Sequence, residues 1–359
     1  MKAAVCNQFG KPLIIENIDI ADPGPGQVRV RLSACAICHS DILYCDGAWG
    51  GDLPAVFGHE AAGIVDIVGP GVEGLVKGVH VVVTLIRSCG KCYYCVQGAP
   101  TACEKTFPLD KQSPLSTKSG EPIFHGLRTG AFAEYVLVDA SQVVVIPDDI
   151  SLETASLLAC SVITGIGAVT NTAKVFPGST VCVIGAGGVG LNSIQGAVIV
   201  GAEQVIAIDI EEKKLKVAEG FGATKCFNAL TTNVVSSVLN CTGGRGVDFV
   251  FVTVGVKSAF EEAFEMIGKL GSVVLVGMPP DDVMAEFQPV SFANDGKRIL
   301  GSKMGSSRIQ IDIPFLVALY KKGRLKLDEL ISGRYRLEEI NDAILAVKNG
   351  TAIRNIIVF

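Results

Sequence analysis

The chain contains 359 residues, of which 49% are hydrophobic and 41 are glycine, and it carries a net charge of −5 at pH 7. A chain of this length can form about two domains with hydrophobic cores, and the acidic balance argues against a protein that binds the nucleic-acid backbone. Glycines and polar residues interrupt the most apolar stretch, residues 181–208, so no run of about 20 apolar residues offers a membrane span.

The first part of the chain, up to about residue 160, is predicted to be mainly β. Short β-branched runs at 27–32 and 79–84 are separated by turn signals at 23–26 and 69–71. The N-terminus lacks the apolar segment and cleavage site of a secretory signal. We therefore expect a cytoplasmic protein in which cysteines stay reduced.

Three separate residues of this part are metal ligands by type: Cys38, His59 and Cys160. Two thiolates and one imidazole leave the fourth position of a zinc ion open for water or a substrate oxygen, as a catalytic zinc site requires. Each residue alone is unremarkable, since a single buried cysteine such as Cys160 is more often part of a hydrophobic core. An open zinc site is the hypothesis for the three together.

A second cysteine set lies between these residues, at the spacing C-x2-C-x2-C-x7-C: Cys89, Cys92, Cys95 and Cys103. The spacing suits a closed zinc cage that serves structure rather than chemistry. Two disulfides and an iron–sulfur cluster are the alternatives. A reducing compartment disfavours disulfides, and Glu104 follows the last cysteine where an iron–sulfur run often has proline.

From about residue 181 the pattern changes to apolar strands separated by helix-length segments. The strand-like runs are 181–184, 205–208, 247–252 and 272–276. This alternation predicts a parallel sheet with crossover helices. The tail returns to mixed character and ends in a strand-like run at 356–359, so we expect an α/β unit inserted in a mainly β domain.

A glycine-rich turn follows the first of these runs and fits G-x-G-x-x-G: Gly185, Ala186, Gly187, Gly188, Val189 and Gly190. Such a turn lets the backbone approach a pyrophosphate at a helix N-terminus. Asp209 closes the next strand about 20 residues later, where an acid hydrogen-bonds the adenosine ribose. Because this carboxylate would repel a 2′-phosphate, the sequence predicts NAD binding, with NADP less favoured.

These motifs together resemble the zinc-dependent alcohol dehydrogenases of the medium-chain dehydrogenase/reductase family, over essentially the whole chain. The family's G-H-E signature is present at 58–60, the cysteine lobe follows it, and Arg354 precedes the terminal apolar strand. The resemblance implies an α/β protein. A GroES-like, mainly β catalytic domain (1–161 and 304–359, with a structural zinc lobe at 88–104) would accompany a Rossmann domain with a doubly wound parallel sheet (162–303).

The resemblance also implies roles for single residues. Cys38, His59 and Cys160 would hold a catalytic zinc, in addition to the structural zinc of the lobe. Asp41 would orient His59, Glu60 would lie behind the metal, and Ser40 would take the substrate proton. The residues implied in cofactor binding, besides the glycine turn and Asp209, are His39, Thr164, Lys214, Val276 and Arg354.

Two departures from the family pattern bear on the chemistry. Leu43 stands where well-known members have the histidine that completes a proton relay, so the relay is expected to run through Ser40 and the cofactor ribose. Phe107 and Trp49 occupy the positions that bind the glutathione adduct of formaldehyde in other members, which disfavours that substrate. The expected pocket is apolar and is formed by Ser40, Trp49, Leu85 and Leu127.

The expected function is reversible hydride transfer between NAD and an apolar or aromatic primary alcohol or its aldehyde. The alternatives are an NAD(P)-dependent carbonyl or double-bond reductase on the same scaffold, and a catalytically silent NAD-binding sensor or structural protein. The resemblance implies a homodimer, or a tetramer of such dimers, without nucleic-acid or membrane partners. The physiological substrate, its stereochemistry and the preferred direction stay open.

Overall fold

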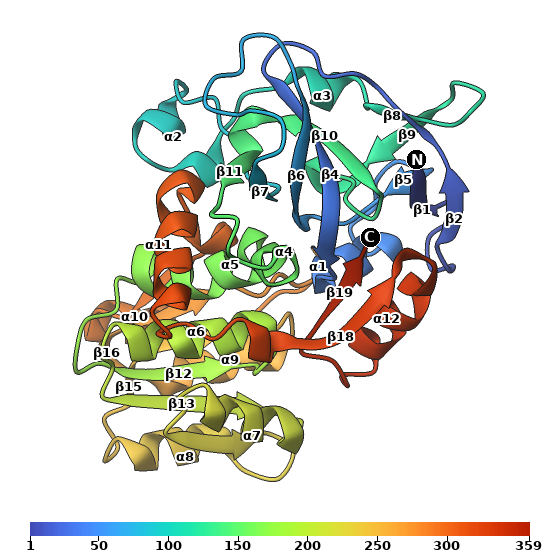
Figure 1. The fold of residues 1–359 in the computed structure, drawn as a ribbon. Coiled ribbons are helices and arrows are strands. Elements are labelled where there is room, and N and C mark those ends of the chain that lie inside the picture. The colour runs from blue at the N-terminus through green and yellow to red at the C-terminus, as the bar shows by residue number, and fades with distance from the viewer. The chain divides into compact units, whose positions relative to one another are not determined.

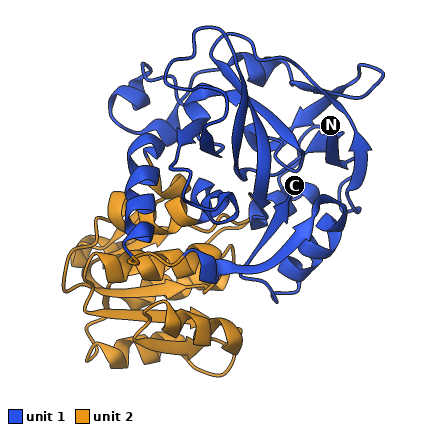
Figure 2. Cartoon of the chain, in the orientation of Figure 1, with its two compact units in different colours: residues 1–161, 308–322, 327–359 blue, residues 162–307, 323–326 orange.

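The computed structural model describes residues 1–359, and the chain divides into two compact units (Figure 2). Unit 1 contains residues 1–161, 308–322 and 327–359, and unit 2 contains residues 162–307 and 323–326. Residues 304–307 and 323–326 thus fall on the other side of the division drawn from the sequence. No single helix is long and apolar enough to cross a membrane; one bent pair, 152–159 with 161–172, meets the length and composition criteria jointly.

Unit 1 is built on two β-sheets, whose strands are drawn in blue, green and red in Figure 1. One sheet has the order β2 (Ile14–Asn17), β1 (Lys2–Cys6), β5 (Ala55–Val56), β9 (Pro122–His125), β8 (Leu115–Ser116) and β3 (Asp19–Ile20). The other has the order β11 (Val143–Val145), β7 (His80–Val83), β6 (Glu60–Val68), β4 (Gln27–Ala36), β19 (Arg354–Val358) and β18 (Ile331–Arg336), and β10 (Tyr135–Asp139) also pairs with β4.

Strand β4 shows why these segments form sheets. Its alternating sequence buries Val28, Val30 and Leu32 and turns Arg31 to solvent, which is the period of a half-buried strand. β6 runs antiparallel to it, and at Gly63 the two backbones approach so closely that a Cβ atom would lie 2.1 Å from the Arg31 carbonyl oxygen. A side chain at that position would push the strands apart.

The helices of unit 1 are short and connect or cover these strands. They are α1 (His39–Cys45), α2 (Tyr93–Val96), α3 (Pro108–Lys111), α4 (Leu152–Ser156), α11 (Ile309–Lys321) and α12 (Ile340–Lys348). Single 3-10 turns that matter below are η1 (Pro100–Ala102), η2 (Gly126–Arg128), η3 (Ala140–Gln142) and η4 (Leu157–Ala159). One continuous hydrophobic core joins both sheets with α1 and α12, so the mainly β character predicted for this region is confirmed.

Unit 2 is a parallel sheet with crossover helices. The strand order is β14 (Lys225–Asn228), β13 (Gln204–Asp209), β12 (Thr180–Ile184), β15 (Val247–Val252), β16 (Ile267–Leu275) and β17 (Arg298–Gly301). Numbered within the unit, this is the order 3-2-1-4-5-6 of dinucleotide-binding sheets. The helices are α5 (Ser161–Gly167, whose first residue belongs to unit 1), α6 (Gly188–Ile199), α7 (Glu212–Gly220), α8 (Val234–Cys241), α9 (Lys257–Met266) and α10 (Pro289–Asp295).

The core of unit 2 explains its apolar strands. Val238 of α8 and Phe260 and Ala263 of α9 are buried with Ile206 and Val250 on one face of the sheet. Because helices cover the sheet, the strands read as continuous apolar runs rather than alternating ones. The fold class expected from the sequence, a GroES-like β domain with a Rossmann unit, is confirmed.

Candidate active site

Four buried side chains of unit 1 converge on one point. Cys38, His59, Glu60 and Cys160 each offer a ligand atom, and these atoms all lie within 4.8 Å of one another. The fold gathers them from separate elements: Cys38 precedes α1, His59 and Glu60 stand at the start of β6, and Cys160 follows η4. The donor set of two thiols and one imidazole fits a zinc ion, with Glu60 or a substrate oxygen available for the fourth position.

Asp41 organises this cluster through three hydrogen bonds. Its Oδ2 accepts from the backbone N–H of Cys38 at 3.0 Å, and its Oδ1 accepts from the backbone N–H of Gly58 at 3.0 Å. The same Oδ1 lies 2.9 Å from Nδ1 of His59. With Nδ1 engaged, Nε2 of His59 is the nitrogen left to bind a metal, which is the positioning role expected for Asp41.

The two thiols of the cluster differ in character. Their shared hydrogen bond lowers the pKa of Cys38 well below its ordinary value and raises the pKa of Cys160. His59 lowers the pKa of Cys38 further. Cys38 is therefore the more acidic thiol of the pair, and the thiolate is the form that binds metal.

Within the cluster, Glu60 forms a buried ion pair with Arg354. The two side chains are 0% and 6% exposed, and Nη2 of Arg354 donates to Oε1 of Glu60. Burial raises the pKa of Glu60 to about 7 even though Arg354 opposes the shift. The resemblance implied a role in cofactor binding for Arg354; within unit 1 it pairs with Glu60 of the cluster.

The remaining residues of the expected pocket are less buried than the cluster. Ser40 and Leu43 are half-buried on α1, whereas His39, the first residue of this helix, is exposed. Trp49 packs edge-on against Tyr44 at a ring-centroid distance of 5.2 Å. Leu85 and Leu127 are half-buried and follow β7 and β9.

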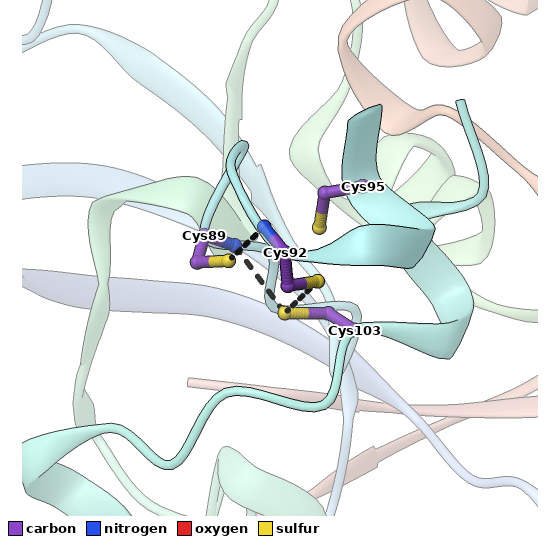
Figure 3. Close-up of side chains that lie close together, drawn as sticks. All are labelled: Cys89, Cys92, Cys95 and Cys103. Carbon is purple, nitrogen blue, oxygen red and sulfur yellow. Dashed lines mark hydrogen bonds between the residues drawn. The ribbon is translucent and has the colours of Figure 1, made fainter. Parts of the chain in front are cut away.

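The second cysteine set forms a separate half-buried cluster (Figure 3). The sulfur atoms of Cys89, Cys92, Cys95 and Cys103 lie within 4.8 Å of one another, and all twelve cysteines of the chain are free thiols. Backbone N–H groups of the loop itself contact these sulfurs: that of Cys92 reaches Cys89 at 3.3 Å, and that of Cys89 reaches Cys103 at 3.4 Å. Four converging thiols can fill all four coordination positions of a zinc ion, so the cluster fits a closed zinc site.

In unit 2 the glycine turn connects β12 to α6 as expected. Gly185 has a φ of +97°, and a Cβ atom at Gly190 would lie 1.7 Å from the Gly185 carbonyl oxygen. At Gly187 a Cβ atom would meet nothing within 4 Å, so the turn leaves space on the side where a pyrophosphate approaches. These three positions match the three roles of the fingerprint glycines.

Asp209 ends β13 beside this turn. Its Oδ2 accepts from the backbone N–H of Ala186 at 2.7 Å, and its Oδ1 accepts from that of Glu211 at 2.9 Å. Among the other expected cofactor contacts in unit 2, Thr164 is 7% and Val276 is 8% exposed, while Lys214 is half-buried on α7.

Sequence reasoning missed a buried polar group beside the cysteine lobe. Arg87 is 1% exposed, pairs with Asp110, and lies with its guanidinium carbon 4.5 Å from the ring centroid of Phe107. His125 is 4% exposed, and burial lowers its pKa to about 4, assisted by the charge of Arg87. Arg87 and His125 supply four of the six buried side-chain nitrogens that lack a hydrogen-bond partner.

Comparisons with known proteins agree with this architecture. Residues 24–148 match the alcohol dehydrogenase GroES-like domain and residues 188–320 match the zinc-binding dehydrogenase domain. Alcohol dehydrogenase-like 7 of Arabidopsis thaliana is 35% identical, over 98% of this chain and 94% of that protein.

Two solved structures share the fold along the whole chain. Benzyl alcohol dehydrogenase from Acinetobacter calcoaceticus has a TM-score of 0.93 and 32% identity, covering 100% of this chain and 99% of its own. A putative zinc-binding dehydrogenase from Sinorhizobium meliloti 1021, bound to NADP, has a TM-score of 0.85 and 27% identity, with coverage of 100% and 99%. The chain therefore belongs to the zinc-type alcohol dehydrogenases of the medium-chain dehydrogenase/reductase family.

Proposed function

We propose that this protein is a zinc- and NAD-dependent alcohol dehydrogenase that interconverts an apolar or aromatic primary alcohol and its aldehyde. The observation that carries the proposal is the buried cluster of Cys38, His59 and Cys160, in which Asp41 turns Nε2 of His59 toward the two thiols. A catalytically silent NAD-binding protein on the same fold would not need this ligand set. A zinc ion held there supplies Lewis-acid polarisation of an alcohol or carbonyl oxygen.

Side chains of the protein itself would transfer the proton of the substrate alcohol. Ser40 precedes Asp41 on α1, two residues from the ligand Cys38, and its hydroxyl is half-buried. In the oxidising direction its hydroxyl would accept the proton of the substrate alcohol while donating its own proton onward. Leu43, one turn further along α1, has no group that could take that proton, so a bound cofactor's ribose or solvent would have to receive it.

Cofactor preference is proposed from the acidic end of β13. NAD accepts a hydride at its nicotinamide ring, and the carboxylate of Asp209 would hydrogen-bond the ribose hydroxyls. Glu211 and Glu212 follow it after Ile210, and three acids at this strand end disfavour a 2′-phosphate. The NADP-bound relative shows that the alternative exists on this fold, so a carbonyl or double-bond reductase that uses NADP is the second candidate.

The substrate class is proposed from the apolar residues that the family resemblance places in the substrate pocket. Trp49, Leu85 and Leu127 offer aromatic and aliphatic surface and no charge, which suits a ring or alkyl chain rather than an ionic group. The solved relative named for benzyl alcohol supports an aromatic substrate.

We also propose a homodimer, with a tetramer of dimers as the alternative. The edge strand β17 of unit 2 carries the exposed Ile299, and Val290 and Met284 before it in sequence are both 75% exposed. Exposed apolar groups near an open strand edge favour a subunit contact. A cytoplasmic location is proposed from the free cysteines.

Metal analysis combined with a substrate screen tests this function. We expect two zinc ions per chain and oxidation of benzyl and medium-chain primary alcohols with NAD at a higher kcat/KM than with NADP. One zinc per chain in active protein would reject a catalytic zinc. Activity with NADPH on enals or ketones, without alcohol oxidation, would support the reductase.

A further inference from the structure

Gln142 joins the two backbone segments that carry Leu85 and Leu127. It is the last residue of η3, and its side chain is 0% exposed. Its Nε2 donates to the Thr84 carbonyl oxygen at 2.9 Å and to the Arg128 carbonyl oxygen at 3.1 Å. Each of these carbonyls belongs to the residue next to a leucine of the proposed pocket.

The remaining polar atoms of Gln142 are engaged as well. Its backbone carbonyl accepts from the Thr84 N–H at 3.0 Å, and its Oε1 accepts from the Asp139 N–H at 3.3 Å. The residue therefore connects its own turn to both segments through side chain and backbone. Its side chain cannot rotate without breaking a buried hydrogen bond.

The segment of Leu127 depends on such support. Leu127 and Arg128 have φ values of 53° and 62°, a left-handed conformation that leucine and arginine rarely adopt. Thr129 Oγ1 donates to the Leu127 carbonyl oxygen at 2.8 Å, and the bond from Gln142 holds the next carbonyl. Two consecutive carbonyls of a strained turn are thus fixed by side chains.

We propose that Gln142 is a positioning residue for substrate specificity: by bonding both segments, it sets the separation of Leu85 and Leu127 and so the width of the substrate pocket. This inference rests on the proposed function, because it takes these two leucines as pocket residues. Loss of the amide would let the left-handed turn relax. The change would alter which alcohols fit the pocket, rather than lower kcat/KM for every alcohol by the same factor.

A matched control exists in unit 2. Gln195 is 5% exposed, and its side chain also bridges backbone groups: Nε2 donates to the Lys326 carbonyl oxygen at 3.0 Å, and Oε1 accepts from the Lys326 N–H at 2.7 Å. Replacing either glutamine removes buried hydrogen bonds of the same kind. Only Gln142 contacts the segments of the proposed pocket.

The test compares Gln142→Met and Gln142→Leu with Gln195→Met and Gln195→Leu in the full-length, zinc-loaded enzyme. The readouts are Tm and kcat/KM for benzyl alcohol and for 4-alkylbenzyl alcohols of increasing size. We expect both pairs of variants to lower Tm. Gln142 variants should change the ratio of kcat/KM between large and small alcohols by about tenfold or more, mainly through KM; Gln195 variants should keep this ratio within about twofold.

Equal loss for every alcohol in the Gln142 variants, or the same ratio change in the Gln195 variants, would overturn the inference. The methionine variants keep the side-chain volume, so they serve if the leucine variants fail to fold. Failure of both Gln142 variants to fold while both Gln195 variants fold would assign Gln142 to folding and reject the specificity role. A wild-type enzyme that oxidises none of these alcohols would instead reject the proposed function.

Discussion

The two cysteine-containing clusters of unit 1 differ in ligand set and in surroundings: one combines two cysteines with His59 and Glu60, and the other has four cysteines. Cys38 and Cys160 are buried beside His59, whereas all four cysteines of the lobe are only half-buried. In the first cluster, side chains from distant parts of the chain position the ligands; in the lobe, backbone N–H groups of the loop itself do so. The two clusters therefore differ in burial and polar support as well as in ligand set.

The polar groups next to each cluster differ as well. Asp41 has three partners and Glu60 is paired with Arg354 at the buried cluster. Near the lobe, Arg87 stands two residues before Cys89, and it and His125 leave four buried nitrogens unpaired. The polar side chains next to the buried cluster have nearly all their hydrogen-bond partners, whereas those beside the lobe do not.

The largest effect should come from removing one ligand of each cluster. Cys160→Ala should lower kcat for alcohol oxidation by about a thousandfold or more, since an oxygen-polarising ion loses a ligand, and should remove one zinc per chain. Cys103→Ala should also remove one zinc but leave kcat within about tenfold while lowering Tm, as expected for a structural site. Equal loss of kcat in both variants would contradict the division of roles.

A smaller effect concerns pH and the unpaired His125. Its folded-state pKa of about 4 lies below the ordinary 6.5, so the unfolded chain takes up the proton first as the pH falls. The stability that depends on neutral His125 is complete above pH 6.5 and is lost toward pH 4, up to roughly 3 kcal/mol and roughly 2 kcal/mol at pH 5.

Urea unfolding at pH 7.5 and pH 5, for wild type and His125→Asn, measures this loss. The difference in unfolding free energy between the two proteins should shrink at the lower pH, because asparagine does not titrate. Parallel pH dependence in both proteins would show that His125 is better solvated or paired than its burial indicates.

The smallest effect separates the two kinds of support. Asp41→Asn should weaken zinc binding or kcat/KM by about tenfold to a hundredfold, because a neutral amide holds His59 less well. Asp110→Asn removes a carboxylate near the lobe, the partner of Arg87, and should leave kcat/KM within about threefold. Chelator competition and steady-state rates measure both variants, and a larger loss of activity for Asp110→Asn would reverse the comparison.

Local patterns were readable without the structure. The alternation at 27–32 became β4, and the apolar runs at 181–184 and 205–208 became β12 and β13. The spacing of the four lobe cysteines and of the turn glycines lies within single loops, so short-range geometry already brings those residues together. The ligand set Cys38, His59 and Cys160 was a hypothesis from residue type to which the family resemblance gave a role, because nothing local links residues so far apart.

What the sequence by itself determined was therefore the set of local devices: the strands, the cysteine loop, the glycine turn and the acid that follows it. Only the tertiary structure placed Arg354 against Glu60, 294 residues away, and buried Arg87 and His125. It alone set Gln142 between Thr84 and Arg128. The reason is physical: burial and hydrogen-bond partners depend on which strands pack together, and that is a property of the whole fold rather than of neighbouring residues.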